Sequence, residues 1–215
     1  TVHVLGLWID AHDDALRRFL DGQRQIRQLR GEAIAAKLAS VGFKDVLAGA
    51  LKIADGAALN RPHFAKYLVE AGYCDLEQQA FRKWLGAGKV ADVACAWPSL
   101  ENVVAVIHAA GGLAVLAHPD KYGVTRTKKD QLLARFRAAG GDGLELVSGM
   151  QSSHQTEDLL RLAIKHGLAC STGSDFHSPS QTWSELGAQP QLPEQALPIW
   201  ACLREADNKL RYHAG

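Results

Sequence analysis

The sequence predicts an α/β protein with parallel strands, because helix, glycine and strand follow one another three times in its second half. Each of these helical segments ends at one or two glycines, and a strand-like segment follows, at residues 113–117, 144–147 and 168–172. The first of these segments is a continuous apolar run, which is typical of a strand buried on both faces. Strands that alternate with helices indicate parallel strands joined by crossover helices. We therefore expect an α/β sheet or barrel.

Composition and charge indicate a globular protein without a strong preference for polyanions. The 215 residues are 47% hydrophobic and 22% charged, and 24 Lys and Arg stand against 23 Asp and Glu. This balance argues against long DNA as a partner, since DNA binding relies on an excess of basic residues. The sequence contains no apolar run of about 18 residues, which argues against a membrane partner.

Four widely spaced cysteines form no C-x-x-C pair. Their spacing argues against a zinc site made of thiolates and against a disulfide scaffold. We expect a protein of the reducing cytoplasm.

The first half of the chain changes character twice. Residues 2–9 read as a buried strand, and a long helix follows from about Asp14 to Gly42. Residues 44–92 then contain short helical segments without convincing strands. We expect 1–43 and 93–215 to form the α/β part and 44–92 to form a small all-helical insertion, in which Asp75 opens the last helix.

Three potential metal ligands follow predicted strands. His118 comes after the first strand-like segment, while Asp175 and His177 come after the third. Parallel strands place their carboxyl ends at one edge of the sheet, where α/β proteins collect functional groups. In an extended chain residues i and i+2 project to the same face, so Asp175 and His177 should point together. A structural histidine and a turn-capping aspartate remain the alternative interpretation, and His3, within the first strand, is as compatible with the core as with a ligand.

Five short motifs then give a resemblance to the polymerase-and-histidinol-phosphatase (PHP) family of metal-dependent phosphoesterases. They are Leu116-Ala117-His118-Pro119, Gly173-Ser174-Asp175-Phe176-His177, His3-Val4-Leu5-Gly6-Leu7, Asn60-Arg61-Pro62-His63-Phe64 and Gly88-Lys89. The resemblance extends over nearly the whole chain. It implies an incomplete, distorted (β/α)7 barrel with a helical insertion, as in the bacterial branch of nucleoside 3′,5′-bisphosphate phosphatases and related RNases that act on RNA 5′ ends.

The resemblance also implies a site. The metal ligands would be His3, His118, Asp175 and His177, with Asp175 and His177 also catalytic. Two or three divalent ions would bind in the intact enzyme, with Mn favoured and Fe or Zn as alternatives. Such ions lower the pKa of a bound water and neutralise phosphoryl oxygens. The implied substrates are 3′,5′-bisphosphonucleotides or the 5′ ends of short RNA.

The family's N-terminal His-x-His and related ligand motifs are not found in the sequence. We therefore expect the chain to be a fragment of a larger enzyme that binds at most one metal and is weakly active or inactive alone. A missing N-terminal segment or another copy of the chain would then cover its exposed strand edge.

Basic residues could bind a substrate phosphate at two places. Arg61, His63 and Lys89 lie in the insertion, and Lys121 and Arg126 follow His118. Charged donors near a helix start suit phosphate. The alternative for each is a solvated surface position.

Two other functions remain open at this stage. One is a catalytically incomplete scaffold or regulatory fragment of such an enzyme. The other is a nucleic-acid-binding module built from the short helices, against which the scattered basic residues between 44 and 92 argue.

Overall fold

The computed structural model describes residues 2–177 and 185–203. Its elements follow in the order β1 (Val4–Leu7), α1 (Asp14–Ser40), α2 (Val46–Ala54), α3 (Arg61–Glu70), α4 (Glu77–Ala80), the π-helix η1 (Phe81–Leu85), α5 (Leu100–Ala109), β2 (Leu113–Leu116), the 3₁₀ turn η2 (Pro119–Tyr122), α6 (Arg126–Ala138), β3 (Gly143–Ser148), α7 (Ser153–His166) and β4 (Ala169–Gly173). They divide into two compact units, residues 1–16 with 98–215, and residues 17–97. We call these the strand unit and the helical unit.

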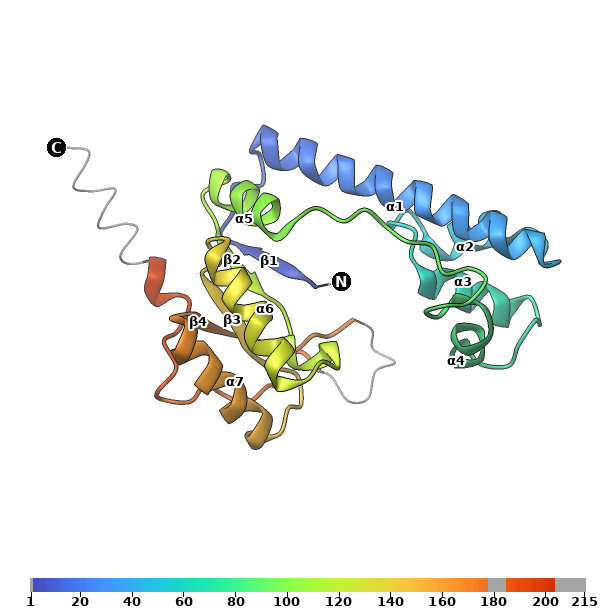
Figure 1. The fold of residues 1–215 in the computed structure, drawn as a ribbon. Helices are drawn as coiled ribbons and strands as arrows, with labels where there is room; N and C mark the ends of the chain where they lie inside the picture. The colour runs from blue at the N-terminus through green and yellow to red at the C-terminus, as the bar shows by residue number, and fades with distance from the viewer. Residues whose placement is uncertain (1, 178–184, 204–215) are drawn as a thin grey trace. The chain divides into compact units, whose positions relative to one another are not determined.

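The strand unit is built on a four-stranded sheet of order β1-β2-β3-β4. β2, β3 and β4 are parallel, which confirms the prediction from the three helix-glycine-strand repeats. β1 pairs with β2 in the antiparallel sense, with Val4 opposite Leu116 and Leu7 opposite Leu113. α6 and α7 connect the parallel strands and lie side by side against the sheet (Figure 1). Among the described strands the sheet is open.

One face of this sheet carries the main core. Alternate residues of the strands meet the apolar faces of α5, α6 and α7, and the centre of the core consists of Val104, Leu116, Leu133, Phe136, Leu144, Leu146, Leu159 and Leu162. Capping residues define where these helices begin and end. The Ser99 and Ser152 side chains accept hydrogen bonds from N–H groups in the first turns of α5 and α7. Gly167 ends α7 with φ at +60°.

The opposite face of the sheet is more polar. Val115 and Ala169 pack there against Ile199, which follows a short stretch of chain bridged to the outer edge of β4. Glu145 and Ser171 also point to this face and are buried. Because side chains alternate along a strand, His3 is on the same face, one residue before Val4.

The helical unit has its own core. The C-terminal half of α1 contributes Ile34 and Leu38 to a core that also contains Phe64 and Leu68 of α3. The sequence interpretation placed residues up to 43 with the strands, whereas this core places residues 17–43 with the helical unit. Among the described residues, no helix combines the length and apolar character needed to cross a membrane.

Candidate metal and phosphate site

Sheet topology brings three of the predicted ligands to one edge. His118 lies two residues beyond β2, and Asp175 two residues beyond β4, so both follow the carboxyl ends of parallel strands. β1 runs antiparallel, so its beginning, and with it His3, lies at the same edge. The backbone confirms this, because Ala117 donates its N–H to the carbonyl oxygen of His3 at 3.0 Å.

The imidazoles of His3 and His118 meet across this edge. His3 Nδ1 lies 3.1 Å from His118 Nε2, and the rings are arranged edge to face. Tyr122 supports the pair, because its hydroxyl donates to Ala117 O at 2.7 Å and accepts the His3 N–H at 3.0 Å. Burial raises the pKa of Tyr122 to about 12, so this phenol stays protonated at neutral pH.

Glu145 holds the backbone of His118, and the sequence interpretation missed it. Its Oε2 accepts the His118 N–H at 2.7 Å, where His118 adopts a left-handed conformation with φ at 31°. Glu145 is only 6% exposed. Burial raises the pKa of its carboxyl group, and the hydrogen bond from the His118 N–H lowers this pKa by a smaller amount. The available signal was an acidic residue inside an otherwise apolar strand, Leu144-Glu145-Leu146.

Gly173 makes room for this carboxylate. A Cβ at Gly173 would lie 2.1 Å from Glu145 Oε1, so a side chain there would displace the group that holds His118. The end of β4 and the loop after β2 are thus packed against the same buried carboxylate.

Asp175 and His177 lie close together, although the reason given from the sequence is wrong. β4 ends at Gly173, and Asp175 has a left-handed backbone with φ at 50°, so the two residues do not lie on an extended strand. Instead His177 Nδ1 donates to the Asp175 carbonyl oxygen at 2.8 Å and lies 3.6 Å from its Oδ1. A donating Nδ1–H leaves Nε2 as the electron-pair donor, which is the tautomer that binds metals.

Lys121 also belongs to this site. Its ammonium donates to Asp175 Oδ2 at 2.6 Å, and its side chain is 46% exposed. Burial alone would raise the pKa of Asp175, but the hydrogen bond and charge of Lys121, with the nearby imidazoles of His118 and His177, lower it overall. Asp175 is therefore a carboxylate at neutral pH, as ligation requires.

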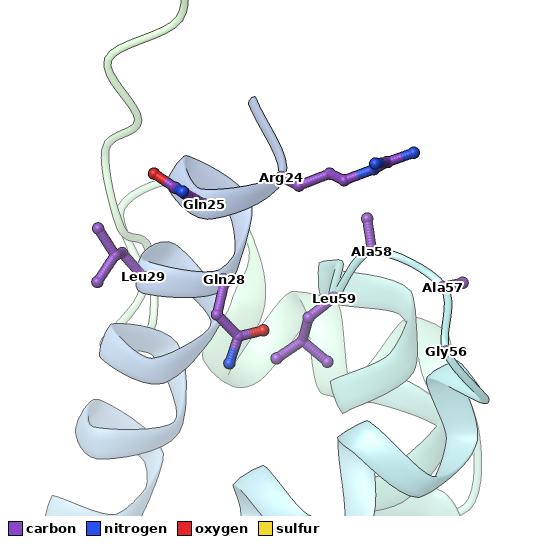
Figure 2. A pocket seen from close by; sticks show the side chains of 8 residues that line it. All are labelled: Arg24, Gln25, Gln28, Leu29, Gly56, Ala57, Ala58 and Leu59. Carbon is purple, nitrogen blue, oxygen red and sulfur yellow. The ribbon is translucent and has the colours of Figure 1, made fainter. Parts of the chain in front are cut away.

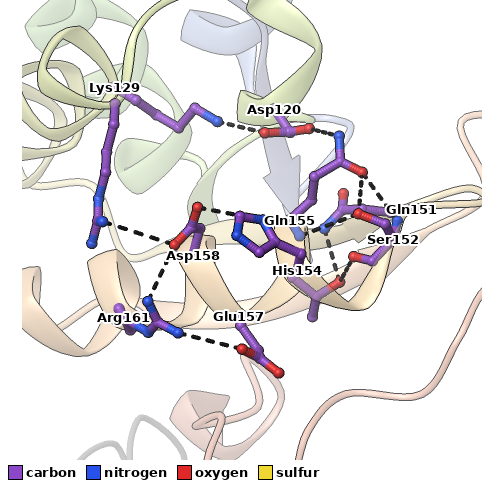
Figure 3. Close-up of polar contacts among 11 residues, drawn as sticks. Asp120, Lys129, Gln151, Ser152, His154, Gln155, Glu157, Asp158 and Arg161 are labelled. Atoms are coloured by element: carbon purple, nitrogen blue, oxygen red, sulfur yellow. Dashed lines mark hydrogen bonds and ion pairs between the residues drawn. The ribbon is translucent and has the colours of Figure 1, made fainter.

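A polar network fixes η2, which carries the backbone from His118 to Lys121. Asp120 binds Lys129 of α6 at 2.5 Å and also accepts a hydrogen bond from Gln155 of α7 (Figure 3). The two side chains of the ion pair are only 12% and 19% exposed. Because side chains of α6 and α7 bind Asp120, they hold the η2 turn between His118 and Lys121 in place from outside the candidate site.

The other predicted phosphate ligands have different surroundings. Arg126 begins α6 and lies 3.9 Å from Asp158 of α7. Arg61, His63 and Lys89 belong to the helical unit. Arg61 donates to Leu85 O at 3.3 Å, and His63 Nδ1 accepts the N–H of Asn60 at 3.2 Å and so completes a capping box. Lys89 is exposed in the turn after η1.

The donor atoms at the strand edge suit a divalent ion. Within residues 2–177 and 185–203 no three His, Cys, Asp or Glu side chains are gathered closely enough to form a metal centre as they stand. Nevertheless, His118 Nδ1 is buried without a hydrogen-bond partner. His3 Nδ1 and His118 Nε2 share a hydrogen bond at 3.1 Å. Two ligand atoms bound to one tetrahedral zinc lie about 3.3 Å apart, so an ion is able to replace the shared proton without a large movement of the rings. Imidazole and carboxylate donors favour Mn, Fe or Zn.

The chain is similar to several known proteins. No protein-family model matches the chain. A 3′,5′-nucleoside bisphosphate phosphatase of Chromobacterium violaceum is 39% identical over 93% of the chain and 70% of its own length. The 5′-3′ exoribonuclease Rnm of Salmonella typhimurium is 39% identical over 93% and 68%, and Rnm of Escherichia coli is 36% identical over 96% and 70%.

Two solved structures share the fold. An amidohydrolase of Chromobacterium violaceum with bound sulfate and no metal has a TM-score of 0.84 and 38% identity, covering 95% of this chain and 72% of that one. A structure described as a metal-dependent phosphoesterase of Bifidobacterium adolescentis has a TM-score of 0.73 and 27% identity, with 95% and 70% coverage. The chain belongs to the PHP-type family of phosphoesterases that includes these nucleoside bisphosphate phosphatases and 5′-3′ exoribonucleases.

Proposed function

We propose that the chain is a metal-dependent phosphoesterase that hydrolyses 3′,5′-bisphosphonucleotides or the 5′ ends of short RNA. The observation that carries this proposal is the approach of His3 Nδ1 to His118 Nε2, 3.1 Å apart, at the sheet edge that also holds Asp175. The names of the relatives supply the substrate classes. We further propose that the open sheet is part of a distorted (β/α)7 barrel.

His3, His118, Asp175 and His177 would hold the metal, with Mn the preferred ion and two or three ions bound in the active enzyme. When bound, such ions lower the pKa of a water and neutralise phosphoryl oxygens. Two observations support these proposed ligand roles: Asp175 is ionised, and His177 donates its Nδ1–H to the Asp175 carbonyl oxygen, which leaves Nε2 as the electron-pair donor. Asp175 and His177 are also proposed as catalytic residues, because as ligands they would hold the ion against the reacting phosphoryl group.

Lys121 is proposed to bind the phosphoryl group that reacts. Its ammonium donates to Asp175 at 2.6 Å in the structure, and a metal on Asp175 would release it. Its three donors can then be directed to phosphoryl oxygens, where charge-assisted hydrogen bonds are strong. Arg126 is proposed as an additional contact at the start of α6.

The function is tested by phosphate release from adenosine 3′,5′-bisphosphate. With Mn²⁺ present we expect turnover, weaker than that of an enzyme with the family's full set of ligands, and with excess EDTA we expect none. Turnover that persists in EDTA would contradict the proposal.

The second phosphate of the substrate is proposed to bind Arg61, His63 and Lys89. Arg61 would carry the charge, because burial, with the charge of Lys66, lowers the pKa of His63 and keeps it neutral at pH 7. His63 would then contribute a neutral hydrogen bond, and Lys89 an exposed ammonium.

We expect Arg61→Ala to raise KM for a nucleoside 3′,5′-bisphosphate far more than for an aryl phosphate. A charge-assisted contact to the second phosphate stabilises binding by about 1.5–3 kcal/mol, which corresponds to roughly 10–150-fold in kcat/KM. Steady-state kinetics with both substrates measure the difference.

Lys52→Ala is the matched control, since Lys52 is an exposed cation of the helical unit in the last turn of α2. This control should change KM for the bisphosphate and for the aryl phosphate by the same factor. Equal losses on both substrates for Arg61→Ala would remove the proposed role and would point instead to its hydrogen bond to Leu85.

A further inference from the structure

The charge of the protein is divided unevenly between its two units. The helical unit, residues 17–97, has 13 Lys and Arg against 8 Asp and Glu, whereas the rest of the chain has 11 against 15. The near-neutral net charge of the whole chain is therefore the sum of a basic unit and an acidic unit. A charge asymmetry of this kind is typical of proteins with a polyanionic ligand.

The excess of positive charge lies mainly on α1. Its basic residues up to residue 37 are Arg17, Arg18, Arg24, Arg27, Arg30 and Lys37, and its acidic residues in the same stretch are Asp14, Asp21 and Glu32. The arginines from 17 to 30 extend along roughly 20 Å of helix. Arg24 pairs with Asp21 at 2.7 Å, but both side chains are more than 60% exposed. Such surface pairs are weak, so an anion can compete for the guanidinium.

A recess lies beside these arginines. It has a volume of about 560 Å³ and is formed by one side of α1 and the loop of residues 56–59. In Figure 2 the Arg24 side chain extends over the loop beside Ala58, and Gln28 points toward Leu59. A guanidinium at the rim, an amide and an apolar floor together suit a flat, polar-edged ring such as a nucleobase.

An aromatic residue accompanies the arginines as well. The guanidinium groups of Arg27 and Arg30 lie 5.7 and 6.0 Å from the ring centre of Trp97, which is half-buried. Proteins bind single-stranded nucleic acid with aromatic rings and guanidinium groups that stack on its bases and with cations that follow its backbone. Trp97 and the arginines of α1 provide groups of these kinds.

We propose that the arginine-rich part of α1 and the adjoining recess form a binding surface for single-stranded RNA. Arg17, Arg18 and Arg24 contact phosphates, and the recess takes a base. The inference rests on the proposed action on RNA and deepens it, because it assigns to the helical unit a contact with the strand beyond the nucleotide that is hydrolysed.

The test is equilibrium binding of a fluorescein-labelled 12-nucleotide RNA by anisotropy, in EDTA so that no hydrolysis occurs. We compare the chain with the triple variant Arg17→Gln, Arg18→Gln, Arg24→Gln. Removing three phosphate contacts should weaken binding at least about tenfold and should reduce the slope of log K against log salt by about 2, since each contact on a single strand contributes about 0.7.

The matched control carries Lys44→Gln, Lys52→Gln and Lys66→Gln, which removes the same charge from exposed positions elsewhere in the helical unit. It should bind RNA almost as the wild type does. Ala57→Leu, at an exposed position of the recess, should weaken binding severalfold without changing the salt slope, because the recess contact is not ionic.

Three results would overturn the inference: no RNA binding by the wild type, equal losses in the two triple variants, or tighter binding to vesicles containing anionic lipid that depends on the same arginines. Phosphate release from the bisphosphonucleotide is measured separately. A chain that is active there but does not bind RNA contradicts only this inference, while a chain that binds RNA but is inactive contradicts only the proposed hydrolysis.

Discussion

Asp175→Asn is expected to abolish metal-dependent phosphate release while leaving the fold intact. The amide keeps the shape of the carboxylate but loses the charge that would bind the ion and that now binds Lys121 at 2.6 Å. Changing groups that merely orient ligands costs 10–100-fold, so loss of the ligand itself should lower turnover at least about 100-fold. His118→Ala should have the same effect, because it removes the imidazole that meets His3. Turnover with saturating Mn²⁺ and the melting temperature are measured for each variant.

The matched control is Asp75→Asn, the same substitution at an exposed position of the helical unit. It should retain wild-type turnover. If Asp175→Asn or His118→Ala also kept turnover near the wild-type value, the assignment of the site would be wrong.

Gly173→Ala is expected to have a large effect on stability. The new Cβ would lie 2.1 Å from Glu145 Oε1, and the carboxylate cannot move aside without weakening its bond to the His118 N–H, now 2.7 Å. Overpacking of this kind costs about 1–3 kcal/mol. Urea denaturation should show the loss in the free energy of unfolding, and metal affinity should fall because His118 is no longer held.

A double-mutant cycle isolates this contact. In the Glu145→Ala background, Gly173→Ala should cost less than about 1 kcal/mol, because the clashing oxygen is gone. Gly22→Ala, a helical glycine with open space around it, should instead stabilise the protein by about 0.5–1 kcal/mol. Equal costs for Gly173→Ala in both backgrounds would show that the carboxylate is not the cause.

The sequence predicted the parallel part of the fold well, because local signals determine it. The order of helix, glycine and strand-like segment indicates β2, β3 and β4, and Ser99 caps α5 as its position suggests. The partner of a helix is not a local property. The apolar positions along α1 indicate which face of this helix is buried. They do not indicate that Ile34 and Leu38 share a core with residues of α3. The sequence likewise gave no sign that the helix expected from Asp75 begins at Glu77 and continues as the π-helix η1.

For the site, the sequence identified groups that follow strand ends and missed groups that act from within a strand or across the fold. His118 and Asp175 were found because they follow strand-like segments. Glu145 was missed because alternation along a strand does not tell which face carries function, and Glu145 lies on the face of the candidate site, where it holds the His118 N–H. The ion pair of Lys121 with Asp175 joins residues 54 positions apart, a contact that only the paired strands create.

The most direct measurement of the central claim is the anomalous scattering of crystals of the chain grown with MnCl₂. The account predicts a manganese peak at the β2–β4 strand edge, about 2.0–2.3 Å from an imidazole nitrogen of His118 and an oxygen of Asp175, with Lys121 turned away from that carboxylate. A map with manganese bound only elsewhere, or with Lys121 still on Asp175 at saturating metal, would contradict it.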